Sequence, residues 1–430
     1  MIGPMTDERR ARLRSAASLI GLAVLVALLA AHRNRLGVRL VPDGWAVWEA
    51  SVSLLERGTY AYFAGDPIRY WPPLPALLLA GLQAVLGVSG GALCALLALS
   101  SGLGWLGWAL VTDAALVPRD LPPGRRLALR AAVGLLHAGL VLLAAGTLLA
   151  HTLLLALVPW WLLALTAAAD GRRHAPTLLA ASGALLLLTH NTAIVWWPGA
   201  ALLLLSGARG ARERVVALLP LAASVVVWLL ARAALDQGAS HPLALGGRHG
   251  PTAYVTQAVT GLGTLVAPSS PAAAFLAGVA LLAAWLLAAR VGVGRARDLA
   301  RVSLLALVGL FALFNVIWVF DRLDNRFMWV FPLLAVPVAA AALVRRAPRL
   351  TLALVLASAV MPVARVVVQA RVDWTAVLGD DLVRPRAWIS TRPVDPSDAR
   401  AADRIEPWRR PWTHTTAEED RRRFEALLGY

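Results

Sequence analysis

The sequence predicts an all-α, polytopic helical membrane protein, and three observations support that class. Of its 430 residues, 59% are hydrophobic and only 15% are charged, whereas about 25% are charged in a typical soluble domain. Apolar runs of about 15–22 residues recur along the chain, close to the length that an α-helix needs to cross a bilayer. These runs lack the two-residue alternation of membrane β-barrel strands.

About eleven of these runs qualify as transmembrane helices. The first follows a short basic segment that resembles the start of a signal peptide. Because many runs follow it, we expect an uncleaved anchor with a cytoplasmic N-terminus. The expected spans lie near 15–31, 91–112, 127–145, 152–169, 176–190, 192–206, 215–234, 272–289, 302–320, 327–343 and 350–368.

Arginines fall in alternate loops between these spans, and this pattern predicts an orientation. The net charge of +16 arises within 1–369, because 370–430 carry 11 Arg against 11 Asp and Glu. Cytoplasmic loops are enriched in basic residues, so the pattern indicates a multi-pass plasma-membrane protein rather than a nucleic-acid-binding one. The loops expected inside contain Arg125, Arg126, Arg172, Arg173, Arg209, Arg212, Arg214, Arg290, Arg295, Arg297, Arg301, Arg345, Arg346 and Arg349.

The run at 73–88 would disturb this alternation if it crossed the membrane. It is short for a span and begins among prolines, so we interpret it as an interfacial or re-entrant helix that follows the first outer loop, 32–72. A short true span is the alternative. The runs 176–190 and 192–206 are also short, and we expect a helix broken at His190-Asn191.

Two regions follow from this organisation. Residues 1–369 form the predicted transmembrane domain, which includes the first outer loop with its interfacial helices. Residues 370–430 form a small extracytoplasmic tail of different composition, rich in Trp and Pro. Residues 235–271 are expected to be an outer loop. The chain has a single cysteine, which excludes a disulfide within it.

Polar residues that could perform chemistry gather on the outer face in this topology. A carboxylate can serve as a general base, and guanidinium groups match phosphate geometry. Plainer interpretations also exist. Asp43 could cap a helix over 44–57, and Arg69 could belong to an interfacial aromatic belt. The histidines could be ordinary interface residues, and the acids near 321–326 could form a solvated turn. The candidates are Asp43, Arg69, Tyr70, His151, His190, Asn191, Asp321, Asp324 and Arg326.

Several short motifs follow one another between residues 10 and 345. They are Asp43 in the first outer loop, Gly58-Thr59-Tyr60, Pro72-Pro73-Leu74-Pro75, Leu188-Thr189-His190-Asn191, and Arg326 through Pro332 with Pro337. In order and spacing they resemble the motifs of the GT-C superfamily of integral-membrane glycosyltransferases, which use polyprenyl-phosphate-linked sugars. Two positions depart from that pattern. Gly44 stands where a second acid is common, and His151 stands where relatives often carry Asp or Glu.

The resemblance implies transfer of a sugar from a polyprenyl-phosphate donor to a hydroxyl of a lipid, glycan or protein acceptor. The reaction would occur on the extracytoplasmic face and invert the anomeric carbon. Asp43 would be the general base, while Arg69 and Arg326 would contact the donor phosphate. A divalent cation, Mg²⁺ or Mn²⁺, is left open. The remaining candidates would contact the substrate or orient a sugar or metal: Tyr70, His151, His190, Asn191, Asp321 and Asp324.

Other classes of protein compete with this interpretation. A lipid or sugar transporter or flippase would carry ionisable residues at the membrane midplane or show repeat symmetry, and neither is evident. A polysaccharide polymerase or ligase would more often have a large late outer loop, whereas 235–271 is modest. A structural membrane scaffold is the remaining alternative.

Overall fold

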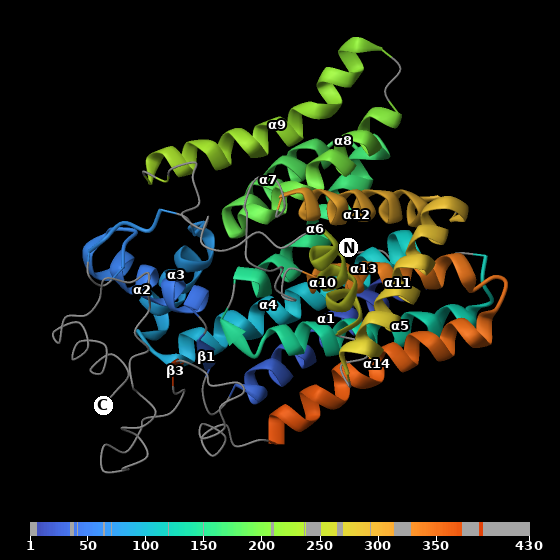
Figure 1. Cartoon of the computed structure of the whole chain (residues 1–430), viewed down its shortest axis with the longest axis horizontal. Coiled ribbons are helices and arrows are strands. Elements are labelled where there is room, and N and C mark those ends of the chain that lie inside the picture. The colour runs from blue at the N-terminus through green and yellow to red at the C-terminus, as the bar shows by residue number, and fades with distance from the viewer. Residues whose placement is uncertain are drawn as a thin grey trace, which may run out of the picture.

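Long helices lie side by side in the computed structural model, and two short helices and three short strands gather at one end of them (Figure 1). The structure describes residues 7–34, 38–40, 42–62, 65–69, 71–118, 120–148, 150–207, 210–235, 237, 251–264, 270–292, 294–313, 328–371 and 387–389.

The first half of the chain contains α1 (Asp7–Arg33), β1 (Val38–Leu40), α2 (Pro42–Arg57), α3 (Leu74–Leu86), α4 (Gly90–Val111), the π-helical turn η1 (Thr112–Leu116), α5 (Pro123–Ala144), β2 (Thr147–Leu148), α6 (Ala150–Ala169), α7 (Ala175–Thr189), the 3₁₀ helix η2 (Asn191–Trp196) and α8 (Trp197–Ser206). The second half contains α9 (Ala211–Ala234), α10 (Pro251–Thr264), α11 (Pro271–Val291), α12 (Arg295–Ala312), α13 (Val330–Leu343), α14 (Pro348–Arg371) and β3 (Ala387–Ile389).

Seven helices of the described chain are long and apolar enough to cross a membrane: α1, α4 with η1, α5, α6, α9, α11 and α14. Helices α7, η2 with α8, and α13 are shorter apolar helices. Each of the eleven predicted spans overlaps a helix of the described residues, so the helical membrane fold is confirmed. The count of eleven crossings remains a prediction.

Helices α1 and α4 run in opposite directions. Cys94 on α4 lies 3.6 Å from the carbonyl of Ala31, whereas Gly102, eight residues later, lies against Ala23, eight residues earlier in α1. The chain between them therefore leaves and returns at the same end of the bundle, so α3 does not cross. With 13 residues at about 1.5 Å each, α3 is also too short for the ~30 Å hydrocarbon core.

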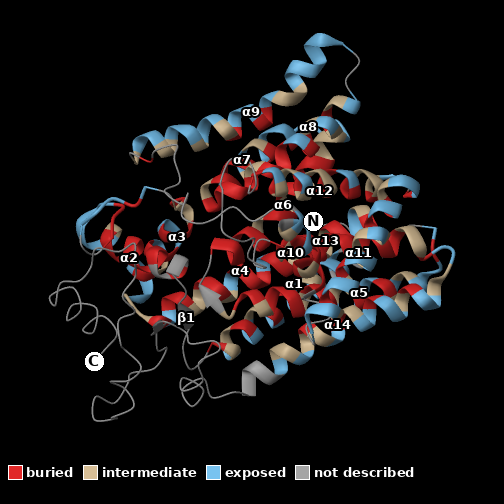
Figure 2. Cartoon of the chain, viewed as in Figure 1, coloured by how far each residue is buried: buried red, intermediate tan, exposed pale blue. Residues whose placement is uncertain are grey.

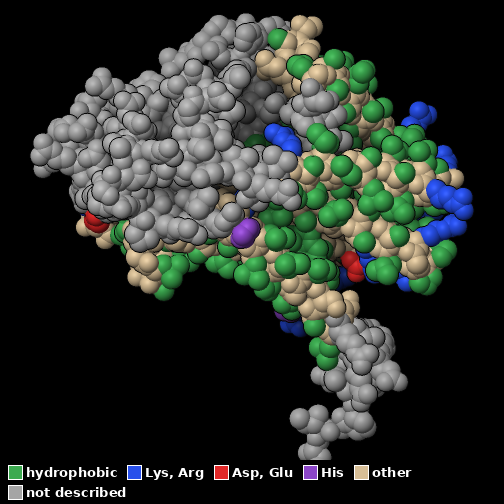
Figure 3. Space-filling view, turned by 90° about the horizontal axis from the view of Figure 1, so that it is seen from below, with side chains coloured by type: hydrophobic (Ala, Val, Ile, Leu, Met, Phe, Trp, Pro, Cys, Tyr) green, Lys and Arg blue, Asp and Glu red, His purple; other side chains and the backbone are tan. Residues whose placement is uncertain are grey.

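The bundle has two distinct ends. At the arginine-rich end, which comprises the turns near 117–122, 170–174, 207–210, 292–294 and 344–347, ion pairs join neighbouring helices. These pairs are Arg130–Asp113, Arg295–Asp170 and Arg345–Asp120. Blue side chains gather there, at the right of Figure 3.

The opposite end, here called the site end, comprises the turns near 34–41, 145–150, 190–191 and 235–237. There Arg33 donates a hydrogen bond to the carbonyl of Leu142, and Asn34 Nδ2 donates to the carbonyl of Ala145 at 2.9 Å. The end of α1 is thus fixed to the end of α5. The predicted alternation of inner and outer loops therefore corresponds to a real division of the turns between two ends.

The core lies among α4, α5, α6 and α13, whereas α1, α9, α11 and α14 expose apolar side chains on their outer surfaces (Figure 2). Glycines permit close helix contacts within this bundle. At Gly199 in α8, a Cβ atom would lie 2.7 Å from the carbonyl oxygen of Val302 in α12. This contact leaves no room for any larger residue without moving a helix.

One expectation was wrong. The outer loop predicted at 235–271 contains α10, which packs so closely on α11 that a Cβ at Gly263 would collide with the backbone of Ala274. The all-α fold class is confirmed, and the helices carry in addition a small sheet of order β2-β1-β3, whose strands have two or three residues each. Of the tail 370–430, the structure describes Ala370, the last residue of α14 (Arg371) and β3, which pairs antiparallel with β1.

Candidate active site

A parallel strand pair brings two predicted site residues to the same edge of the small sheet. β1 and β2 pair with Leu40 opposite Leu148, and each strand leads almost directly into a helix. Asp43 in α2 and His151 in α6 both stand three residues beyond the paired leucines. Because parallel strands leave a sheet at the same edge, the backbones of Asp43 and His151 lie near one another. The side chain of Asp43 is outside the part that the structure describes.

Two histidines meet where α7 ends, at the helix break that the sequence predicted. His190 has extended backbone angles, φ −156° and ψ 127°, and ends α7. Its ring lies against that of His151, with centroids 4.2 Å apart, and both residues are buried. The backbone N–H of Thr192 donates to His190 Nδ1 at 3.2 Å. Because Nδ1 accepts, the neutral ring carries its proton on Nε2.

Asn191 joins this break to the end of α9. Its Oδ1 accepts hydrogen bonds from Trp228 Nε1 at 3.2 Å and from Arg232 Nη1 at 3.5 Å. The Arg232 guanidinium also lies 5.4 Å from the centroid of the Trp228 ring, within reach of a cation–π interaction. Arg232 is therefore a partly buried cation held in place beside two predicted site residues.

Sequence reasoning gave no role to Arg232, although a signal was present. It is an arginine at the outer end of an expected span, where the charge bias predicts few of them. Glu49 was also given no role. It lies in the middle of α2 and is almost completely buried among Trp48, Ala50 and other apolar residues. A buried carboxylate is costly unless its surroundings compensate, and its signal in the sequence is an acid within an apolar helix.

Gln237 connects this cluster to the first outer loop. Its backbone N–H donates to the carbonyl of Arg232 at 2.8 Å. Its buried side-chain Nε2 donates to the carbonyls of Ile68 at 3.1 Å and Trp71 at 2.9 Å. Arg69 lies between these two anchored residues and is exposed, so the predicted phosphate contact stands in the same neighbourhood as Arg232. Tyr70 is outside the described residues.

The Gly58-Thr59-Tyr60 motif has a structural role. Gly58 ends α2 with a φ of +67°, a conformation that favours glycine. The buried Tyr60 hydroxyl donates to the carbonyl of Trp71 at 2.8 Å, immediately before the prolines that start α3. Burial raises the pKa of the Tyr60 hydroxyl, and the nearby Tyr62 raises it further. Tyr60 therefore remains a neutral donor. The motif thus fixes the loop that carries Arg69.

Asp321, Asp324 and Arg326 lie outside the described residues, between α12 and α13. The flanking helices show where this segment starts. Val302 in α12 lies against Gly199, and Gly309 lies against Val195, so α12 runs antiparallel to η2 and α8 and ends toward the site end. The chain therefore enters the segment with these three candidates at the end that holds His190.

A metal site was left open by the sequence. Among the residues that the structure describes, no group of three or more His, Cys, Asp or Glu side chains could hold a metal ion. His151 and His190 supply two imidazoles, which is fewer than a protein metal site usually requires. These two imidazoles alone therefore do not make a metal centre.

The chain is similar to known proteins in its three-dimensional structure. No protein-family model and no curated protein sequence matches the chain. The structure of ArnT from Cupriavidus metallidurans in the apo state is similar, with a TM-score of 0.54 and 19% identity, over 78% of this chain and 61% of that one. The structure of ArnT from the same organism bound to undecaprenyl phosphate has a TM-score of 0.53 and 17% identity, with the same coverage of both chains.

Arabinosyltransferase EmbB from Mycobacterium smegmatis is also similar, with a TM-score of 0.50 and 18% identity, over 80% of this chain and 31% of that one. The chain therefore spans about three fifths of the length of ArnT and less than a third of EmbB. At sequence identities this low, the structural similarity establishes a shared fold alone.

Proposed function

Because the chain has the fold of the GT-C membrane glycosyltransferases, we propose that it transfers a sugar from a polyprenyl-phosphate donor to an acceptor hydroxyl. The observation that carries the proposal is the linked cluster at the site end. A chain of neighbours runs from Asp43 through His151, His190, Asn191 and Arg232 to the loop of Arg69. ArnT, which shares the fold, was solved with undecaprenyl phosphate.

The reaction is a single displacement at the anomeric carbon. The acceptor oxygen attacks C1 of the sugar, the bond from C1 to the phosphate oxygen breaks, and polyprenyl phosphate leaves with the bonding electrons. Asp43 takes the proton of the acceptor hydroxyl, a contribution typically worth about 10²–10⁴-fold. One displacement inverts the anomeric configuration, by analogy with inverting glycosidases.

Cations stabilise the charge that develops on the departing phosphate. Arg69 and Arg326 are the cations that the sequence suggested, and Arg232 joins them as the one held by both a hydrogen bond and an aromatic ring. A held guanidinium loses little entropy on meeting phosphate and matches its geometry with paired N–H groups. Arg232 is therefore our first choice for the phosphate contact.

The other polar residues orient the substrates. His190 can donate from Nε2 to a sugar hydroxyl, while His151 fixes the plane of its ring. Asn191 positions Arg232. The remaining proposed contacts are Tyr70, Asp321 and Asp324. A requirement for Mg²⁺ or Mn²⁺ is tested directly by adding chelator to the transfer assay.

The proposal includes an orientation in the plasma membrane. The arginine-rich end faces the cytoplasm, with the N-terminus on that side. The site end faces outward, where a lipid, glycan or protein acceptor would reach it, and the C-terminal tail lies on the same side. Cysteine labelling in whole cells, in protein with Cys94→Ala, tests this: Asp66→Cys should react with an impermeant reagent, and Arg172→Cys should not.

The decisive experiment compares Asp43→Asn with Asp66→Asn in purified protein supplied with undecaprenyl-phosphate-linked sugars. Asp66 is an exposed acid in the same loop and has no assigned role. Transfer should fall at least about 100-fold in Asp43→Asn and remain near wild type in Asp66→Asn. Near-normal transfer by Asp43→Asn would exclude it as the base. Donor binding by the wild type without any transfer would favour a flippase.

A further inference from the structure

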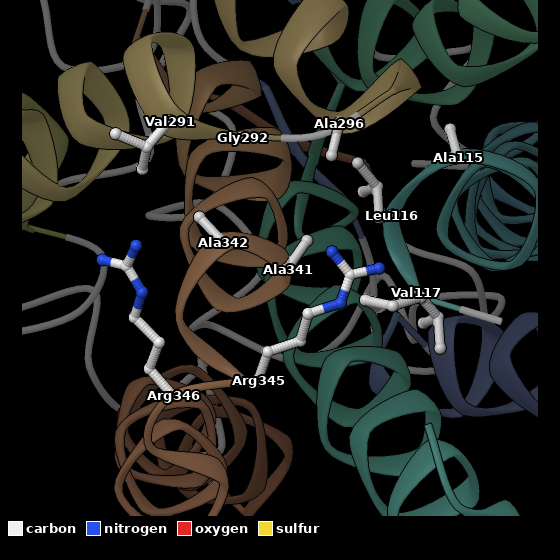
Figure 4. A pocket seen from close by; sticks show the side chains of 11 residues that line it. Ala115, Leu116, Val117, Val291, Gly292, Ala296, Ala341, Ala342, Arg345 and Arg346 are labelled. Atoms are coloured by element: carbon white, nitrogen blue, oxygen red, sulfur yellow. The ribbon is translucent and has the colours of Figure 1, made fainter. Parts of the chain in front are cut away.

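A cavity of about 200 Å³ opens at the arginine-rich end, remote from the candidate active site. Its walls come from four places in the chain: η1 and the turn after it, the end of α11, the start of α12 and the last turn of α13. Most of the lining is apolar, including Leu116, Val117, Val291 and Ala296. Figure 4 shows Arg345 and Arg346 extending from the end of α13, with Arg345 beside Val117 and Arg346 on the side of Val291.

The charges at this cavity do not balance. Arg345 Nη2 donates to Asp120 Oδ1 at 2.8 Å, and that bond lowers the pKa of Asp120 and raises that of Arg345. Asp120 is largely exposed, however, and exposed pairs are weak. Arg346 has no ion pair among the residues that the structure describes. Three other acids of this end are engaged with other arginines: Asp113 with Arg130, and Asp170 and Asp298 with Arg295.

The mouth of the cavity borders the surface that faces lipid. Val291 lines the cavity and is 42% exposed on α11, a helix that is long and apolar enough to cross a membrane. A volume of about 200 Å³ is below the ~300–1,000 Å³ of pockets that enclose a whole drug-sized ligand. The site suits a small anionic group whose attached chains continue outside, along the apolar surface of α11.

We propose that this cavity binds the headgroup of an anionic phospholipid, with the phosphate between Arg345 and Arg346. The carbons next to the phosphate would contact Val291 and Ala342. Guanidinium groups match phosphate oxygens, and basic pockets between membrane helices are suited to lipid headgroups. The site lies at the opposite end from the proposed sugar transfer, so each proposal can fail without the other.

The test uses the purified full chain, delipidated in neutral detergent, with phosphatidylglycerol, phosphatidylcholine and inorganic phosphate as probes. Bound lipid is counted by native mass spectrometry across a titration. The variant Arg345→Gln/Arg346→Gln is compared with Arg172→Gln/Arg173→Gln. The control pair is also adjacent, exposed and at the arginine-rich end, but it does not line the cavity.

We expect wild type and the control to bind phosphatidylglycerol at least about tenfold more tightly than phosphatidylcholine. A surface arginine contributes about fivefold to binding of an anionic lipid, so the double variant should lose on the order of 20-fold. Arg346→Gln alone, which keeps the Arg345–Asp120 bond, should lose about fivefold in affinity for phosphatidylglycerol. This single variant replaces the double variant in the test if the double variant does not fold.

Three results would overturn the proposal. Equal losses in the two double variants would indicate attraction to surface charge in general. Displacement of lipid by inorganic phosphate at similar concentrations would indicate a site for soluble anions. No preference of the wild type for phosphatidylglycerol over phosphatidylcholine would indicate that no headgroup site exists.

Discussion

The two ends of the bundle use polar residues in opposite ways. At the arginine-rich end, acids and arginines form ion pairs that remain substantially exposed, such as Asp113 with Arg130. At the site end, His151, His190 and Asn191 are buried. Both ends were equally recognisable in the sequence as polar interruptions between apolar runs, and the difference in burial became apparent only in the folded chain.

This difference separates two reasons for keeping a polar residue. An exposed charge in a loop costs little, and its distribution follows the rule that sets membrane orientation. A buried polar group costs free energy unless its hydrogen bonds are satisfied. The site end holds several buried polar side chains close to one another, and chemistry on a polar substrate requires that arrangement.

The largest effect is expected from Asn191→Ala. The change removes the acceptor for Trp228 Nε1 and for Arg232 Nη1, and losing the partner of a donor that is shielded from water costs about 1–3 kcal/mol. Thermal unfolding in detergent should show a clear decrease in the apparent melting temperature. Asn191→Asp keeps an oxygen acceptor at the same position and should recover most of the loss. Equal melting of wild type and Asn191→Ala would mean that this buried network contributes nothing.

A smaller effect is expected from Asp113→Asn at the other end. The change breaks the exposed pair with Arg130, and exposed pairs contribute at most about 1 kcal/mol. The same melting assay should show little change, and sugar transfer should be unaffected. If the loss matched that of Asn191→Ala, the distinction between the two ends would not hold.

The smallest effect concerns pH. The hydrogen bond from Arg345 lowers the pKa of Asp120 below its ordinary value of 3.8. A carboxyl with a lowered pKa in the folded state adds stability above its unfolded value and loses that stability as pH falls through the folded value. Wild type should therefore exceed Asp120→Asn in melting temperature slightly at neutral pH, and the gap should close below about pH 3.8. A gap that persists at pH 2 would refute this account of the pair.

The helices were predictable from the sequence because long apolar runs determine them. The interpretation of 73–88 as a helix that does not span followed from its sequence, because the run is short and begins among prolines. Helix α10 was missed because residues 251–264 contain Thr, Gln and Gly, and their pattern resembles a loop. Its stability as a helix depends on contact with α11, which no local pattern reveals.

The candidate site was predictable only in part. His190 and Asn191 stood at a visible break between two short apolar runs, and the structure confirms the break. The pairing of β1 with β2 was not predictable, because strands of three and two residues have too few positions to show a pattern. Arg232 acquires its importance from Asn191 and Trp228, partners that are distant in the sequence.

The equal spacing from the paired leucines to Asp43 and to His151 constrains how related chains can differ in length. Inserting one residue between Leu40 and Asp43 would rotate α2 by about 100°, since a helix turns once every 3.6 residues. The position of Asp43 on the helix would then turn away from its present neighbours, while His151 stayed where it is. The segments from Leu40 to Asp43 and from Leu148 to His151 can therefore change length only together. The turns at the arginine-rich end can each change length independently.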